Sequence, residues 1–108
     1  MKGSEIMFVN IAEFPPIKPG KEEEFKEWFA WSNGVFEGFD GFVSRSLLKS
    51  TKEEEKYIAI LEFESEGAFM AMHMSKEHQE ARAKVDPLFE GSPTPHFYEV
   101  ISIRRPGA

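Results

Sequence analysis

Residues 57–69 read YIAILEFESEGAF and decide the fold class. The first seven are mostly apolar and rich in β-branched and aromatic residues, which is typical of a β-strand. Ser65 follows this strand and can cap a helix that begins in the apolar run after it. A strand that passes directly into a helix indicates a mixed fold in which sheet and helices share one core.

The same periodicity divides the rest of the chain. It predicts strands over 6–14, 42–48 and 97–103 and helices over 21–36 and 68–88, the second either continuous or broken near Ser75. Strands 42–48 and 57–63 are expected to pair as a hairpin. The order βαββαβ predicts an α+β, ferredoxin-like fold with both helical segments on one face of a four-stranded antiparallel sheet. We expect one domain over 6–103, with tails at 1–5 and 104–108.

Composition excludes several classes of protein. The chain has 108 residues, no cysteine and a net charge of −6. Without cysteine there is no disulfide scaffold, thiolate zinc site or cysteine nucleophile. The acidic balance makes nucleic acid an unfavourable partner. No apolar run is long enough to cross a membrane or to form a signal peptide, so we expect a cytoplasmic protein with no membrane partner.

Both faces of the predicted sheet are apolar. In the first strand Val9 and Ile11 lie opposite the face of Phe8, and in the third strand Ile58 and Ile60 lie opposite the face of Leu61. Two helical segments can cover only one face, and a bare apolar face is larger than a monomer usually exposes. We therefore predict a homodimer packed sheet to sheet. A monomer with simply hydrophobic strands is the alternative.

Asn10 is the most informative polar residue, because its amide lies in mid-strand and in phase with apolar neighbours. A buried amide needs a partner. The partner is either a backbone group or a ligand between the sheet and the helices.

The histidines and methionines leave two questions open. His73 and His78 do not converge on one metal at helical spacing, whereas His78 and Arg82 are four residues apart and share a face. His78 is either a ligand of haem iron, a hydrogen-bond donor or a surface residue, and His96 is expected in a loop. The methionine-rich run 67–74 either lines a pocket for a flat apolar ligand or fills the core.

Two motifs carry a family resemblance over residues 6–103. The turn EGFDGF at 37–42 and the junction FESEGAF at 63–69 resemble the antibiotic biosynthesis monooxygenase (ABM) domain, and within it the bacterial haem-degrading monooxygenases. The resemblance implies a dimeric α+β barrel that oxygenates aromatic or conjugated substrates with O₂. It also implies that no cofactor is required, or that haem serves as both substrate and cofactor.

The family's pocket carries an Asn, a Trp and a His between the sheet and the helices. Asn10 matches the asparagine and would orient oxygen or substrate as the catalytic residue, but Met72 stands at the position of the tryptophan and Arg82 at that of the histidine. With Phe8 and Phe69, these two residues would bind the substrate, and His78 is the candidate ligand for haem iron. The alternative is a non-catalytic dimer that binds haem or another small apolar ligand.

Overall fold

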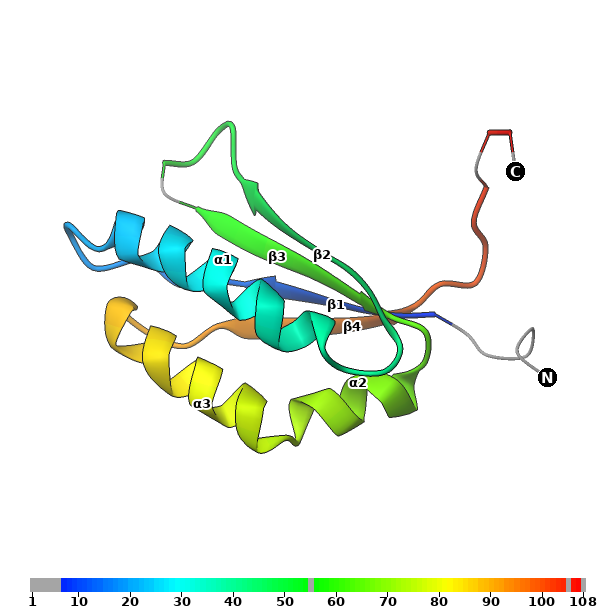
Figure 1. Ribbon diagram of the computed structural model, residues 1–108. Coiled ribbons are helices and arrows are strands. Elements are labelled where there is room, and N and C mark those ends of the chain that lie inside the picture. The colour runs from blue at the N-terminus through cyan, green and yellow to red at the C-terminus, as the bar shows by residue number, and fades with distance from the viewer. Residues whose placement is uncertain (1–6, 55, 105, 108) are drawn as a thin grey trace.

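The computed structural model describes residues 7–54, 56–104 and 106–107. The elements follow in the order β1 (Phe8–Glu13), α1 (Glu22–Glu37), β2 (Phe42–Lys49), β3 (Tyr57–Phe63), α2 (Glu66–His73), α3 (Lys76–Val85), a short 3₁₀ helix (Asp86–Leu88) and β4 (Thr94–Glu99) (Figure 1). The strands form one antiparallel sheet in the order β2-β3-β1-β4. This arrangement confirms the predicted α+β, ferredoxin-like fold.

Two serines act as helix caps: Ser65, which was expected to cap a helix, and Ser75, where a break was one of two readings. Ser65 accepts a hydrogen bond from the backbone N–H of Ala68 and starts α2, and Ser75 accepts one from the N–H of His78 and starts α3. The second helical stretch is therefore broken at Ser75, as one of the two readings had it. Ile6, the first residue of the predicted first strand, lies outside the described residues.

The prediction for the last strand was wrong in its bounds. β4 runs over Thr94–Glu99 rather than 97–103, and it includes His96, which was expected in a loop. β4 pairs only with β1 and is an edge strand, so Pro95 is tolerated there although it cannot donate to a central ladder. The apolar residue Ile101 lies beyond the strand and is 90% exposed.

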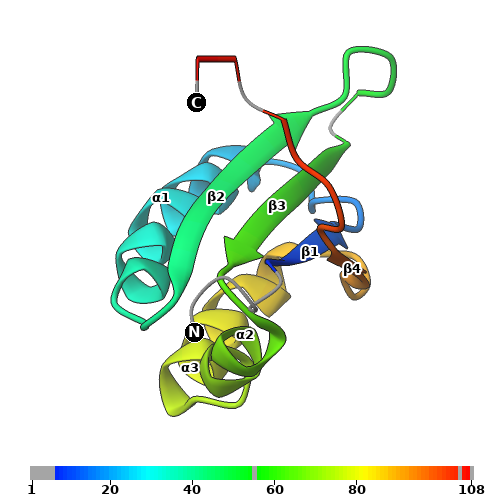
Figure 2. The same cartoon turned by 90° about the vertical axis from the view of Figure 1, so that its right-hand side faces the viewer.

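All three α-helices cover one face of the sheet (Figure 2). The side chains of β3 alternate, with Tyr57, Ala59, Leu61 and Phe63 buried toward the helices and Ile58, Ile60 and Glu62 half-buried on the opposite face. No described helix lies over that opposite face. The predicted homodimer therefore stays a prediction, with an apolar sheet face that still lacks a cover.

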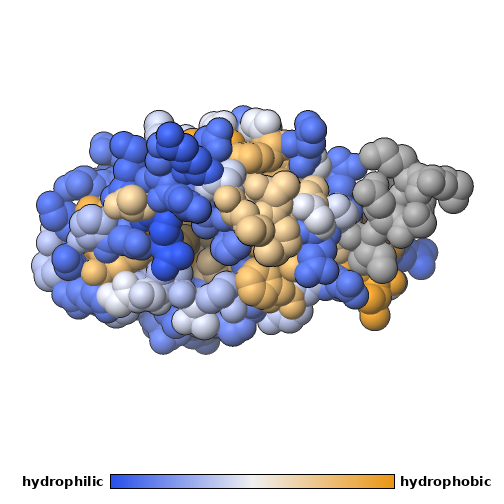
Figure 3. Space-filling model, turned by 90° about the horizontal axis from the view of Figure 1, so that it is seen from below, coloured by the Kyte–Doolittle hydropathy of each residue, from blue (hydrophilic) through white to orange (hydrophobic). Residues whose placement is uncertain are grey.

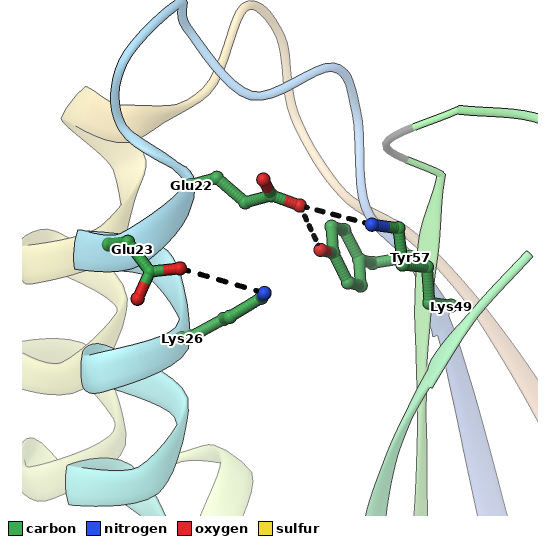
Figure 4. Close-up of polar contacts among 5 residues, drawn as sticks. All are labelled: Glu22, Glu23, Lys26, Lys49 and Tyr57. Carbon is green, nitrogen blue, oxygen red and sulfur yellow. Dashed lines mark hydrogen bonds and ion pairs between the residues drawn. The ribbon is translucent and has the colours of Figure 1, made fainter.

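A polar cluster joins the start of α1 to the sheet (Figure 4). The Tyr57 hydroxyl donates a hydrogen bond to a carboxylate oxygen of Glu22, and the Lys49 ammonium lies 3.5 Å from the same oxygen. The Tyr57 hydrogen bond, followed by the charge of Lys49, lowers the pKa of Glu22. The carboxylate therefore bridges α1, β2 and β3 as an anion.

Glycine is required at position 41, in the turn before β2. Gly41 has a φ of +87°, and a Cβ there would lie 2.6 Å from the Cβ of Ala68. The turn can therefore approach the start of α2 only with glycine.

Among the described residues, no helix has both the length and the apolar composition needed to cross a membrane.

Candidate functional site

A cavity of about 130 Å³ lies between the sheet and the helices. All four strands and all three α-helices contribute to its wall, which is mostly apolar. The apolar lining includes Phe36, Leu61, Phe69, Met72, Val85 and Phe97. The polar lining is confined to a few side chains, as is usual for small-molecule sites.

Five of the six predicted site residues line this one cavity: Asn10, Phe69, Met72, His78 and Arg82. Phe8 does not line it. The ring of Phe8 packs behind the wall, 5.1 Å from Phe69 and 5.9 Å from Phe97 between ring centroids. The structure therefore gathers the predicted set, with Phe8 supporting the aromatic wall from the core.

The methionine-rich run faces two ways. Met72 is 1% exposed and lines the cavity, whereas Met70 and Met74 are exposed on the outside of α2. Seen from below, the surface over α2 and α3 is largely hydrophilic, and apolar side chains gather near the junction of the two helices (Figure 3). Of these three methionines, only Met72 lines the cavity.

Asn10 satisfies part of its hydrogen-bonding capacity within the fold. Its side-chain nitrogen donates to the backbone oxygen of His96 at 3.2 Å, across the pair β1–β4. The carbonyl oxygen of the amide accepts no hydrogen bond from any described residue. An amide that is anchored through one atom and lines a cavity can offer its remaining donor and acceptor to a ligand.

His78 lines the cavity as a half-buried imidazole. Its ring lies 4.8 Å from that of His73 and 5.9 Å from that of Phe36, between centroids. Burial is the main cause that lowers the pKa of His78 to about 4, and the charges of His73, Arg82 and Arg45 act in the same direction. At neutral pH the ring is therefore uncharged and can accept a hydrogen bond.

This shift predicts a stability change between pH 6.5 and pH 4. In that window the unfolded chain binds a proton at His78 that the folded chain does not, so the free energy of unfolding should fall as the pH is lowered. Urea unfolding at a series of pH values measures this slope. The lowered pKa of Glu22 contributes to the pH dependence of stability only below pH 4.5, the ordinary pKa of a glutamate.

The His78→Gln variant should lose much of that slope, because the titrating group is gone. Gln79→Ala is the control, since it changes an exposed position of the same helix without removing a titrating group, and it should keep the slope. A wild-type slope in His78→Gln would contradict the assignment.

Arg45 is a cavity residue that sequence reasoning missed. Arg45 of β2 pairs with Leu61 of β3. Leu61 faces the helices, so Arg45 faces them too. A register shift between Phe42 and Ser44 produces this orientation, since simple alternation from Phe42 would turn Arg45 outward. An arginine in mid-strand is an unusual feature, but only the bulge shows which face it occupies.

Comparison with known proteins now decides the family. The model of the antibiotic biosynthesis monooxygenase family matches residues 7–84. The chain belongs to this family. The ABM match spans β1 to α3 and so includes most of the cavity wall.

One curated relative is close enough to support the same assignment. The protein YczJ of Bacillus subtilis, described as uncharacterized, is 33% identical over 86 residues, which cover 78% of this chain and 90% of YczJ. It adds no activity to the ABM assignment.

Solved structures share the ABM fold at low identity. A Bordetella bronchiseptica protein assigned to the family has a TM-score of 0.79 at 23% identity, covering 91% of this chain and all of its own. A haem-degrading protein of Mycobacterium tuberculosis has a TM-score of 0.70 at 24% identity, covering 94% and 98%. SnoaB, a cofactor-independent oxygenase of Streptomyces nogalater, has 0.67 at 18%, covering 95% and 97%. At these identities the likeness concerns the fold.

Proposed function

We propose that this ABM protein is a small monooxygenase that reacts an aromatic or conjugated substrate with O₂ in the cavity between sheet and helices. The cavity itself is the observation that carries the proposal. Its wall is mostly apolar, and a low-dielectric interior strengthens the few polar contacts available to a reacting group. Its volume of about 130 Å³ is close to that of an engineered cavity of about 150 Å³ that binds benzene in another protein.

The side chains present do not fit haem. Arg82 stands where the resemblance places the iron-ligating histidine, and its Nε donates to Asp86 at 2.9 Å. Arginine stays protonated and is not an iron ligand. His78 lines the wall, but the cavity of about 130 Å³ holds one aromatic ring rather than a tetrapyrrole. We therefore propose a reaction that does not use haem.

A hydroxyarene with a free para C–H is the simplest substrate for such chemistry. It supplies four electrons to O₂, takes up one oxygen atom to become a quinone and releases the other as water, so no separate reductant is needed. In this proposal neutral His78 accepts a hydrogen bond from the ring hydroxyl. The amide of Asn10 donates to the oxygen on which negative charge develops.

We also propose that the functional unit is a homodimer. The outer sheet face carries half-buried Val9, Ile11, Ile58 and Ile60, and Tyr98 of the edge strand is exposed beside them. The same face of a second copy would cover these side chains by an isologous contact. The cavity lies on the other side of the sheet, so this contact would leave it open.

Replacement of Asn10 tests the catalytic proposal. With metal-free protein and O₂, we expect turnover of phenol, its ortho- or meta-methyl and -methoxy derivatives, or meta-hydroxybenzoate, with one labelled atom from ¹⁸O₂ in the quinone. Asn10→Ala should lower kcat/KM about 100-fold, as the loss of one oxyanion donor does in other enzymes. An oxygen electrode and mass spectrometry measure both quantities.

Gln79→Ala is the control, since it removes an exposed amide on α3 that does not line the cavity. Unchanged turnover in Asn10→Ala, together with a lowered melting temperature, would mean that the amide only supports the β1–β4 pair. Binding of these compounds without oxygen uptake would favour the second candidate, a non-catalytic binding protein. That candidate is supported by Met72 and Arg82 at the positions of the family's tryptophan and histidine.

A further inference from the structure

The cavity wall has a charge opposite to that of the chain as a whole. The protein has 19 acidic against 13 basic residues, yet the lining holds Arg45 and Arg82 and no carboxylate, and its His78 is uncharged at neutral pH. A cleft lined by cationic groups concentrates anions even on an acidic protein. The wall therefore selects for negative charge in whatever it binds.

Arg45 is the cation most firmly held in this wall. Its Nη1 lies 2.8 Å from the Ser32 hydroxyl, 2.9 Å from the Asn33 side-chain oxygen and 3.3 Å from the Phe29 backbone oxygen. The guanidinium carbon lies 3.9 Å and 4.2 Å from the ring centroids of Phe29 and Phe36. All of these partners are neutral.

Arg45 has no counterion within the described chain. None of the described carboxylates pairs with it, whereas the other cavity arginine, Arg82, pairs with Asp86 at 2.9 Å. Removing a charge from water without an ionic partner is costly. Contacts with aromatic rings and neutral acceptors offset part of this cost, and an anionic ligand would offset more.

One edge of the guanidinium is free to bind that ligand. Nε and Nη2 form no hydrogen bond with any described residue, and no described side-chain nitrogen is both buried and without a partner. Each of the two atoms therefore keeps some exposed surface, and Arg45 lines the cavity. They lie on the same edge of the planar group, where two parallel N–H bonds match the two oxygens of a carboxylate.

We propose that the cavity takes a single-ring aromatic anion, whose carboxylate or ring oxygen binds the Nε–Nη2 edge of Arg45 while the ring lies against the apolar wall. This inference rests on the proposed function only in using the same cavity. It names the substrate class and does not depend on the oxygen chemistry.

Burial lowers the pKa of Arg45 to about 9, but the guanidinium stays charged at neutral pH. Its charge therefore favours an anion over a neutral ring of the same shape.

Calorimetry with benzoate and benzamide tests the proposal on the intact protein. The two probes have the same shape and differ in charge. Benzoate should bind at least ten-fold more tightly at pH 7. Arg45→Gln should weaken benzoate binding at least ten-fold and leave benzamide binding unchanged. Arg45→Lys should bind benzoate with an affinity between those of the wild type and Arg45→Gln, because it keeps the charge but loses the second parallel bond.

Lys84→Gln is the matched control, since Lys84 is an exposed cation on α3 whose ammonium lies over Trp31, outside the cavity. It should bind benzoate as the wild type does. If Arg45→Gln does not fold, the binding of the two probes to the wild type and to Arg45→Lys decides. Equal affinity for the two probes, or binding of neither at millimolar concentration, overturns the proposal.

The outcomes separate this inference from the proposed function. Arg45-dependent benzoate binding without oxygen uptake from any hydroxyarene would uphold the anion site and reject the monooxygenase. Oxygen uptake with phenol but not with meta-hydroxybenzoate, unchanged in Arg45→Gln, would uphold the monooxygenase and reject the anion site.

Discussion

Phe25→Ala should cost about 3–5 kcal/mol of the free energy of unfolding, as is typical when a buried phenylalanine is truncated. Phe25 of α1 is 0% exposed. Its ring lies within 6.1 Å of those of Phe14, Trp28, Tyr57 and Phe89, between centroids. The variant loses both burial and several aromatic contacts. The four rings come from a helix, a strand and two loops, and these segments cannot all move to close the gap.

Chemical unfolding of wild type and variant measures this loss. A domain of this size has about 5–15 kcal/mol in total, so the variant should lose a large part of its stability. Trp31→Ala on the same helix is the control, since Trp31 is 47% exposed. It should cost less than about 1 kcal/mol. Equal costs for the two variants would contradict the described core.

Ile60→Glu should dissociate the proposed homodimer. Ile60 lies in the middle of the outer sheet face, with Ile11 beside it on β1 and Ser46 on β2. An isologous contact contains the substitution twice, and each copy would bury an unpaired carboxylate in an apolar interface. Burial of each carboxylate should cost about 2 kcal/mol or more, so the dissociation constant of the dimer should rise by about a thousand-fold.

Sedimentation over a range of concentrations measures this change. Ala30→Glu adds the same charge at an exposed position of α1 and should leave the dimer intact. A wild-type chain that sediments as a stable monomer at micromolar concentration would reject the dimer. A dimer that survives Ile60→Glu would place the contact on another face.

Local patterns were sufficient to predict most of the fold. The strand 57–63 was predicted with its observed bounds, because the alternating burial of β3 needs no information from elsewhere in the chain. Ser65 was recognisable as a helix cap by its own side chain, whereas the break at Ser75 was one of two readings. The edge strand β4 was misplaced because tolerance of Pro95 depends on the strand having one neighbour only.

The candidate site was predictable in its apolar part and not in its charge. Asn10, Phe69 and Met72 follow from inward periodicity and from the family resemblance. Arg45 does not, because a one-residue irregularity in β2 reverses the face on which it lies. The missing counterion is equally invisible in the sequence, since it depends on which carboxylates of other elements come near.

The position of bound benzoate tests the central claim most directly. A crystal structure of the complex should hold the ring inside the cavity, against Phe36, Phe69 or Met72, with its carboxylate within hydrogen-bond distance of Nε and Nη2 of Arg45. Benzoate found only on the outer sheet face, or with its carboxylate turned away from Arg45, would contradict the account.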